Sequence, residues 1–157
     1  MSEKKLRIWT LFLIVVFLIA LYTTSDGRKD RPVWKELRTS LTTDNVKHVS
    51  IQYLSDQTIT LSHEEQQAVI AILQDASFSG SNREHFGSTP DGAISFELQQ
   101  GHVSFSFCAR GPDDVGSQFE TAPSHIDPES QFYIRSGDLA RFIENRLSTK
   151  SNEGTVK

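Results

Sequence analysis

The chain has 157 residues, a formal net charge of −4 and a hydrophobic fraction of 37%. This length suffices for one ordinary domain, and the presence of only one long apolar run excludes a protein that crosses a membrane many times. Cys108 is the only cysteine, so a framework of disulfides within the chain is excluded as well.

The N-terminal part of the sequence predicts a membrane anchor. After a short basic tail, residues 1–7, the stretch IWTLFLIVVFLIALY contains a single polar side chain, that of Thr10. As a helix this run is about 22 Å long, and the threonines that follow extend it toward the thickness of a bilayer core. Trp9 and Tyr22 lie near its two ends, where aromatic residues accumulate at membrane interfaces. We therefore expect residues 8–24 to cross the lipid bilayer once.

A cleaved signal peptide is the alternative interpretation of this run, because such peptides also combine a basic start with an apolar stretch. Thr23 and Ser25 would then precede the cleavage site, where alanine is usual. The orientation is also open to two interpretations. More Lys and Arg residues follow the run than precede it, which favours a cytoplasmic domain. A short tail before one apolar run favours export, and we expect an inner-membrane protein whose C-terminal domain lies outside the cytoplasm.

Residues 25–43 are expected to form a juxtamembrane linker followed by a short helix. The stretch 23–31, TTSDGRKDR, is polar and rich in turn-forming residues. Trp34, Leu37 and Leu41 then recur at the spacing of one helix face. Two interpretations of this helix remain: it lies on anionic lipid headgroups, or it packs on the globular domain as its first helix.

Residues 44–147 are expected to form a small two-layer α+β domain. Alternating apolar and polar residues predict half-buried strands, and apolar residues at helical spacing predict amphipathic helices. The expected elements are strands at 49–53 and 59–61, a helix over 64–76 with a capping box of Ser62 and Glu65, strands at 94–98, 103–107 and 132–134, and a helix over 136–147. The order β-β-α-β-β-β-α is typical of an antiparallel sheet with helices on one face. Residues 148–157 are expected to be a disordered tail.

Two long segments of this domain, residues 79–92 and 109–130, are expected to be loops beside the central hairpin. Loops of this length without secondary structure are usually functional or disordered. Loop residues commonly form recognition surfaces on a rigid scaffold. The residues that we expect to take part in such an interaction are Phe86, Phe119, His125, Ile126 and Asp127.

No catalytic motif is found in the sequence: it has no nucleophile elbow, phosphate-binding loop or dinucleotide fingerprint. We therefore expect no enzymatic activity and no cofactor. Residues 32–150 carry nine Lys and Arg against sixteen Asp and Glu, a net charge of −7, which argues against a nucleic-acid partner.

The expected function is that of a membrane-tethered, non-enzymatic interaction module of the cell envelope, such as an accessory, inhibitor or immunity-type protein. Its partner is expected to be another envelope protein. The alternative is an extracytoplasmic domain that senses a small ligand or a metal through the acidic segment 109–130. In that segment His125, Asp127 and Glu129 stand at alternate positions, and one imidazole with two carboxylates suits zinc or a similar ion.

Overall fold

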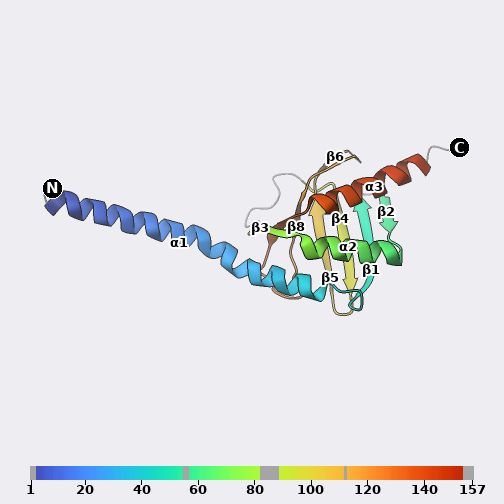
Figure 1. The fold of residues 1–157 in the computed structure, drawn as a ribbon, viewed down its shortest axis with the longest axis horizontal. Helices are drawn as coiled ribbons and strands as arrows, with labels where there is room; N and C mark the ends of the chain where they lie inside the picture. The colour runs from blue at the N-terminus through green and yellow to red at the C-terminus, as the bar shows by residue number, and fades with distance from the viewer. Residues whose placement is uncertain (1–2, 55–56, 82–88, 112, 154–157) are drawn as a thin grey trace.

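The computed structural model describes residues 3–54, 57–81, 89–111 and 113–153. Its elements are, in chain order, α1 (Glu3–Ser40), β1 (Val46–Tyr53), β2 (Gln57–Thr60), α2 (His63–Asp75), β3 (Ser77–Ser81), β4 (Gly92–Leu98), β5 (His102–Phe107), β6 (Ala109–Gly111), β7 (Asp114–Val115), β8 (Gln118–Thr121), β9 (Phe132–Arg135) and α3 (Gly137–Glu153). Figure 1 shows α2 and α3 side by side across one face of a sheet, with the last turns of α1 beside them.

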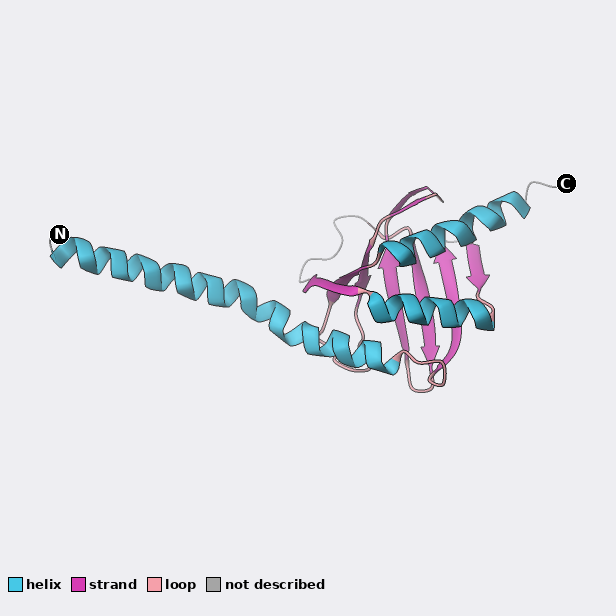
Figure 2. Ribbon diagram, in the orientation of Figure 1, coloured by secondary structure: helices cyan, strands magenta, loops and turns pink. Residues whose placement is uncertain are grey.

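The main sheet has seven strands in the order β2-β1-β4-β5-β8-β9-β3. Every strand pairing among the described residues is antiparallel. Figure 2 shows this sheet as one layer and the helices as the other. The predicted α+β class, with an antiparallel sheet and helices packed against it, is thus confirmed.

The two faces of the sheet differ because apolar and polar residues alternate along its strands. Ile51 pairs with Ile94, and Ile94 with Phe105, and all three side chains are completely buried. On the other face Ser95 pairs with Ser104, and their hydroxyl oxygens lie 2.7 Å apart. The core therefore lies between the sheet and the helices, and the opposite face is polar.

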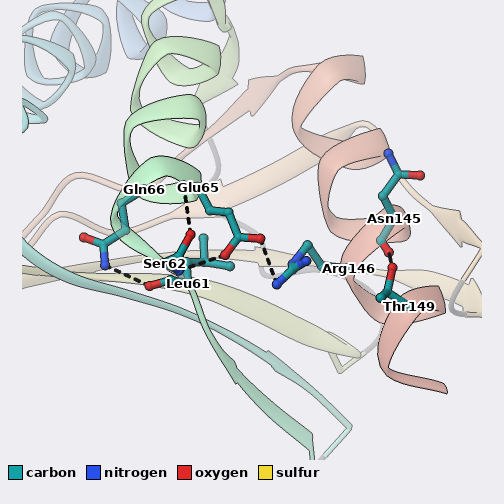
Figure 3. A network of polar contacts seen from close by, with 7 residues as sticks. All are labelled: Leu61, Ser62, Glu65, Gln66, Asn145, Arg146 and Thr149. Atoms are coloured by element: carbon teal, nitrogen blue, oxygen red, sulfur yellow. Dashed lines mark hydrogen bonds and ion pairs between the residues drawn. The ribbon is translucent and has the colours of Figure 1, made fainter. Parts of the chain in front are cut away.

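Helices α2 and α3 begin at the residues that the sequence predicts. The backbone amide of Ser62 donates to Glu65 Oε2 at 2.8 Å, and the Glu65 amide donates to Ser62 Oγ at 3.4 Å. The other carboxylate oxygen of Glu65 lies 2.7 Å from Arg146 Nη2 in α3, as Figure 3 shows. Ser136 caps α3 by accepting the Leu139 amide. The predicted capping box is confirmed, and its glutamate also joins the two helices.

Helix α1 is longer than the sequence pattern indicates. Residues 23–31, expected to form turns, continue the helix, and Pro32 lies inside it. Once a helix is nucleated, each further residue adds one hydrogen bond. The apolar helix before residues 23–31 and the packed helix after them can therefore be joined by helical structure, although this polar stretch has a low helix propensity of its own. The first half of α1 projects away from the domain (Figure 1). Within the described residues, no helix meets the length and apolarity required to cross a membrane.

The last turns of α1 pack on the domain as its first helix. Trp34 is only 4% exposed, and its ring lies edge-on to Phe105 and Phe132 at centroid distances of 6.4 Å and 6.1 Å. Leu37 and Leu41 are completely buried. Because the apolar face of this segment is covered by the domain core, the interpretation as a docked helix is correct and that of a helix lying on headgroups is wrong.

The prediction of a single loop over 109–130 is wrong. Residues 109–115 contain the small β6–β7 ribbon, and β8 lies in the main sheet between β5 and β9. Phe119 in β8 is completely buried, with its ring 6.2 Å from that of Phe107. It belongs to the core and not to an exposed interaction surface. The strand was missed because QFET contains one large apolar residue, too few to show an alternation.

The segment 79–92 and the C-terminal tail also differ from expectation. Strand β3 occupies the start of the segment and pairs with β9 at the sheet edge, where Gly80 marks a register shift. Its sequence, SFSGS, is too polar to predict a strand. Phe86 lies outside the described residues. Helix α3 continues to Glu153, so the first part of the expected tail is helical, in keeping with the absence of Gly and Pro from residues 148–153.

Candidate functional site

A groove of about 370 Å³ lies where the end of α1, the β4–β5 turn and the segment 122–130 meet. These three segments are far apart in the sequence, and the sheet order brings them together. The groove is lined by Glu36 and Ser40 of α1, Asn45 before β1, Leu98, Gln99 and Gln100 of the hairpin, and His125 and Ile126.

The β4–β5 turn is shaped so that His125 can lie against it. Gly101 has a φ of +91°, and a Cβ atom at this position would lie 3.1 Å from the Cβ of His125. Both the positive φ and the close approach favour glycine here. The turn is also tied to the other wall of the groove, since the Gln99 amide donates to the Asn45 carbonyl at 2.8 Å. The Asn45 side-chain amide donates in turn to the Ser40 carbonyl at 2.8 Å.

The segment that carries His125 and Ile126 is fastened to α1 by buried polar groups. Ser130 is 3% exposed, and its hydroxyl contacts Asp30 Oδ1 of α1 at 2.8 Å and Asp127 Oδ2 at 2.9 Å. Asp127 also accepts the Glu129 amide through its other oxygen. Asp127 therefore shapes the turn that forms one wall of the groove, and its side chain is engaged within the segment.

The ionisable side chains that line the groove are one carboxylate, that of Glu36, and one imidazole, that of His125. Burial lowers the pKa of His125, and the neighbouring His102 lowers it further, whereas Glu36 and a hydrogen bond to the His102 backbone act in the opposite direction. The ring is thus held toward its neutral form, although it keeps much of its surface in water. Glu36 is exposed. At the rim, Lys47 Nζ lies 3.5 Å from the Gln99 carbonyl oxygen.

A second groove, of about 530 Å³, lies on the polar face of the sheet. It is lined by Gln52, Leu54, Thr89, Pro90, Asp91, Gly92, Ala93 and Ser106. Leu54 is 54% exposed and has a φ of +43°, a backbone conformation that is uncommon for a residue other than glycine. Its amide donates to the Asp91 carbonyl at 2.8 Å.

Of the five residues expected to form an interaction surface, His125 and Ile126 line the first groove and Asp127 supports it. The groove also contains residues that sequence reasoning did not single out. Glu36 belongs to a segment interpreted as a helix next to the membrane, and Gln99 and Gln100 to a hairpin turn. These residues lie close together because of the order of the strands in the sheet. The local pattern of apolar and polar residues does not indicate that order.

The acidic residues of the segment 109–130 are dispersed. Asp113 is hydrogen-bonded to Ser148 of α3, Asp114 lies 4.0 Å from Arg110, and Glu120 is buried in the sheet, hydrogen-bonded to Gln131. Within the described part of the chain, no three His, Cys, Asp or Glu side chains gather as they would to hold a metal ion.

Comparison of the chain with known protein families, curated proteins and solved structures found no match.

Proposed function

We propose that this chain is a membrane-tethered, non-enzymatic interaction module of the cell envelope. Residues 8–24 cross the inner membrane once, and the domain stands outside the cytoplasm. There it binds another envelope protein through the groove between α1, the β4–β5 turn and the segment 122–130.

The observation that carries the proposal is a run of exposed apolar side chains on α1. All six residues from Phe12 to Phe17 are exposed, by 46% to 63%. Apart from this run, the large apolar side chains with comparable exposure in the described part of the chain are Trp9 of the same helix, at 60%, and Leu54, at 54%. The residues from Phe12 to Phe17 therefore take no part in the hydrophobic core of the domain. Leaving their apolar surface in water is unfavourable by roughly 25 cal/mol per Å². A lipid bilayer would cover that surface.

The path of α1 favours a protein as the partner of the groove. Sixteen residues separate Thr24, at the end of the expected span, from Ser40 in the groove, which is about 24 Å along a helix. The groove would then stand well beyond the lipid headgroups. Because Glu36 and Ser40 lie on the same helix as the anchor, the groove is held at a fixed distance from the membrane.

Membrane insertion is tested by placing charges in the exposed run. Val15→Arg combined with Val16→Arg should release the protein from membranes washed with alkaline carbonate, because each arginine at the centre of a span costs about 2.5–3.5 kcal/mol on insertion scales. The double leucine variant at the same positions is the control and should stay in the membrane fraction. Equal retention of the arginine variant would contradict a membrane span.

Orientation is tested by adding protease to spheroplasts that carry the full-length protein. Digestion of the domain without detergent is expected, whereas protection until detergent is added would show that the domain is cytoplasmic.

The partner is sought by purifying the tagged full-length protein in mild detergent. We expect a stoichiometric protein that is lost with Ile126→Asp, which changes the groove wall, and kept with Glu64→Gln, which changes an exposed residue of α2.

A further inference from the structure

We infer that the groove between α1, the β4–β5 turn and the segment 122–130 receives an arginine side chain of the partner protein. This inference deepens the proposed function and rests on it. It is carried by the charge of the groove, by the kinds of side chain that line it and by its size.

The charge of the groove favours a cation. Glu36 is the only Asp, Glu, Lys or Arg among the lining residues, and it is exposed. His125 is held toward its neutral form by burial and by His102, which lower its pKa. The surrounding domain carries a net charge of −7 over residues 32–150. The Glu36 carboxylate repels a carboxylate or phosphate group and attracts a cation.

The side chains of the groove match the two parts of an arginine. Leu98 and Ile126 provide apolar surface, along which the methylene groups of a long basic side chain can pack. Asn45 uses its amide nitrogen for the Ser40 carbonyl, so its side-chain oxygen is the group left to accept a hydrogen bond. Together with the Glu36 carboxylate it offers acceptors to a guanidinium, which presents five donors in one plane.

The size of the groove is sufficient for a side chain as long as that of arginine. Its volume of about 370 Å³ is near the lower end of the range for ligand sites. A lysine would also bring a positive charge, but its ammonium is a compact group with three donors and fits several separated acceptors less well. A lipid headgroup amine is disfavoured because Glu36 lies twelve residues beyond Thr24, about 18 Å along the helix from the end of the expected span.

Lys47 offers a second test of the inference, because its charge is opposite to that of Glu36. Its ammonium stands at the rim, 3.5 Å from the carbonyl oxygen of Gln99. A positive charge at this place repels an incoming cation and attracts an anion. Removing the charge of Lys47 and removing that of Glu36 must therefore change the affinity for an arginine in opposite directions.

The test uses the full-length protein in lipid nanodiscs and Nα-acetyl-L-arginine N-methylamide as the probe. Binding is followed through the NMR signals of the histidine rings, with that of His125 assigned by its loss in His125→Gln. We expect a saturable shift at millimolar probe concentrations, weaker binding of the lysine analogue and no binding of the glutamate analogue. Glu36→Gln should weaken arginine binding about three- to fivefold, Lys47→Gln should strengthen it, and Glu64→Gln should leave it unchanged.

Several results would overturn the inference. These are the absence of a saturable shift at His125, lysine binding as strong as arginine binding, an affinity that does not respond to Glu36→Gln, or tighter binding of phosphoethanolamine, which would indicate a lipid headgroup. The protein partner captured by the wild type and lost with Ile126→Asp is a separate readout. If that partner is kept while the arginine probe fails, the arginine inference alone is wrong; if no partner binds, the proposed function itself fails.

Discussion

Glu65 is expected to contribute more to stability than an ordinary surface carboxylate, because its two oxygens serve two different helices. One accepts the amide of Ser62 at the start of α2, and the other pairs with Arg146 of α3 at 2.7 Å (Figure 3). The two side chains are only 22% and 34% exposed, so water screens the ion pair incompletely. Arg146 Nε is buried and has no hydrogen-bond partner within the described residues, which makes the arginine dependent on this carboxylate.

We expect Glu65→Ala to destabilise the domain by about 2 kcal/mol. Loss of the capping interaction contributes about 1 kcal/mol. Loss of the ion pair contributes about 1 kcal/mol, at the upper end of the range for exposed pairs because this one is partly buried. Glu65→Gln keeps an oxygen for the cap and loses the charge, so it should cost about half as much. For a domain of this size, 2 kcal/mol corresponds to a decrease in Tm of roughly 6–12 °C.

The two contributions are separated by a double-mutant cycle with Arg146→Met, measured by urea unfolding of the full-length protein in detergent. The coupling free energy between positions 65 and 146 should be about 1 kcal/mol, and it should decrease as salt is added because part of it is Coulombic. The reasoning is refuted if Glu65→Gln costs as much as Glu65→Ala, or if the coupling energy is zero. In the first case the cap would contribute nothing, and in the second the ion pair would contribute nothing.

Three further outcomes follow from single contacts. Trp34→Ala should lower the free energy of unfolding by about 3–5 kcal/mol in urea melts, because it leaves a cavity beside two phenylalanines. Gly101→Ala should cost about 1–2 kcal/mol in the same assay, since an L residue at a φ of +91° is strained and its Cβ meets His125. The pKa of His125 is lower in the folded protein than in the unfolded chain, so between pH 6.5 and the folded pKa the unfolded chain binds more protons. The free energy of unfolding should therefore decrease as the pH drops through this range. The variant His125→Gln should remove this dependence on pH.

The parts of the fold that could be predicted are those whose signal is local. Ser62 and Glu65 identify the start of α2 because a capping box is a pattern of four residues. The hairpin of β4 and β5 is evident because each strand has three large apolar residues at alternate positions, with Gly101 between them. Trp34, Leu37 and Leu41 indicate the apolar face of a helix, although not the surface that covers it.

The parts that could not be predicted depend on contacts between distant segments. Strands β3 and β8 are short, and their polar residues give no alternation; they are strands because β9 pairs with both of them. Once β8 is placed in the sheet, Phe119 must be buried. For the same reason the groove could not be derived residue by residue. Glu36 and His125 are 89 positions apart, and both the docking of α1 and the sheet order are needed before they line one groove.

The continuous α1 gives the proposed tether a property that a flexible linker would not have. A turn-rich linker would let the domain rotate freely above the membrane, and its groove would sample many heights and directions. A helix that passes from the apolar run into the core through Trp34 restricts both. A partner anchored in the same bilayer would then meet the groove at one height, which raises its effective concentration without any additional contact. Inserting two glycines within residues 25–28 should therefore weaken capture of such a partner while the domain stays folded, whereas two inserted alanines should weaken it less.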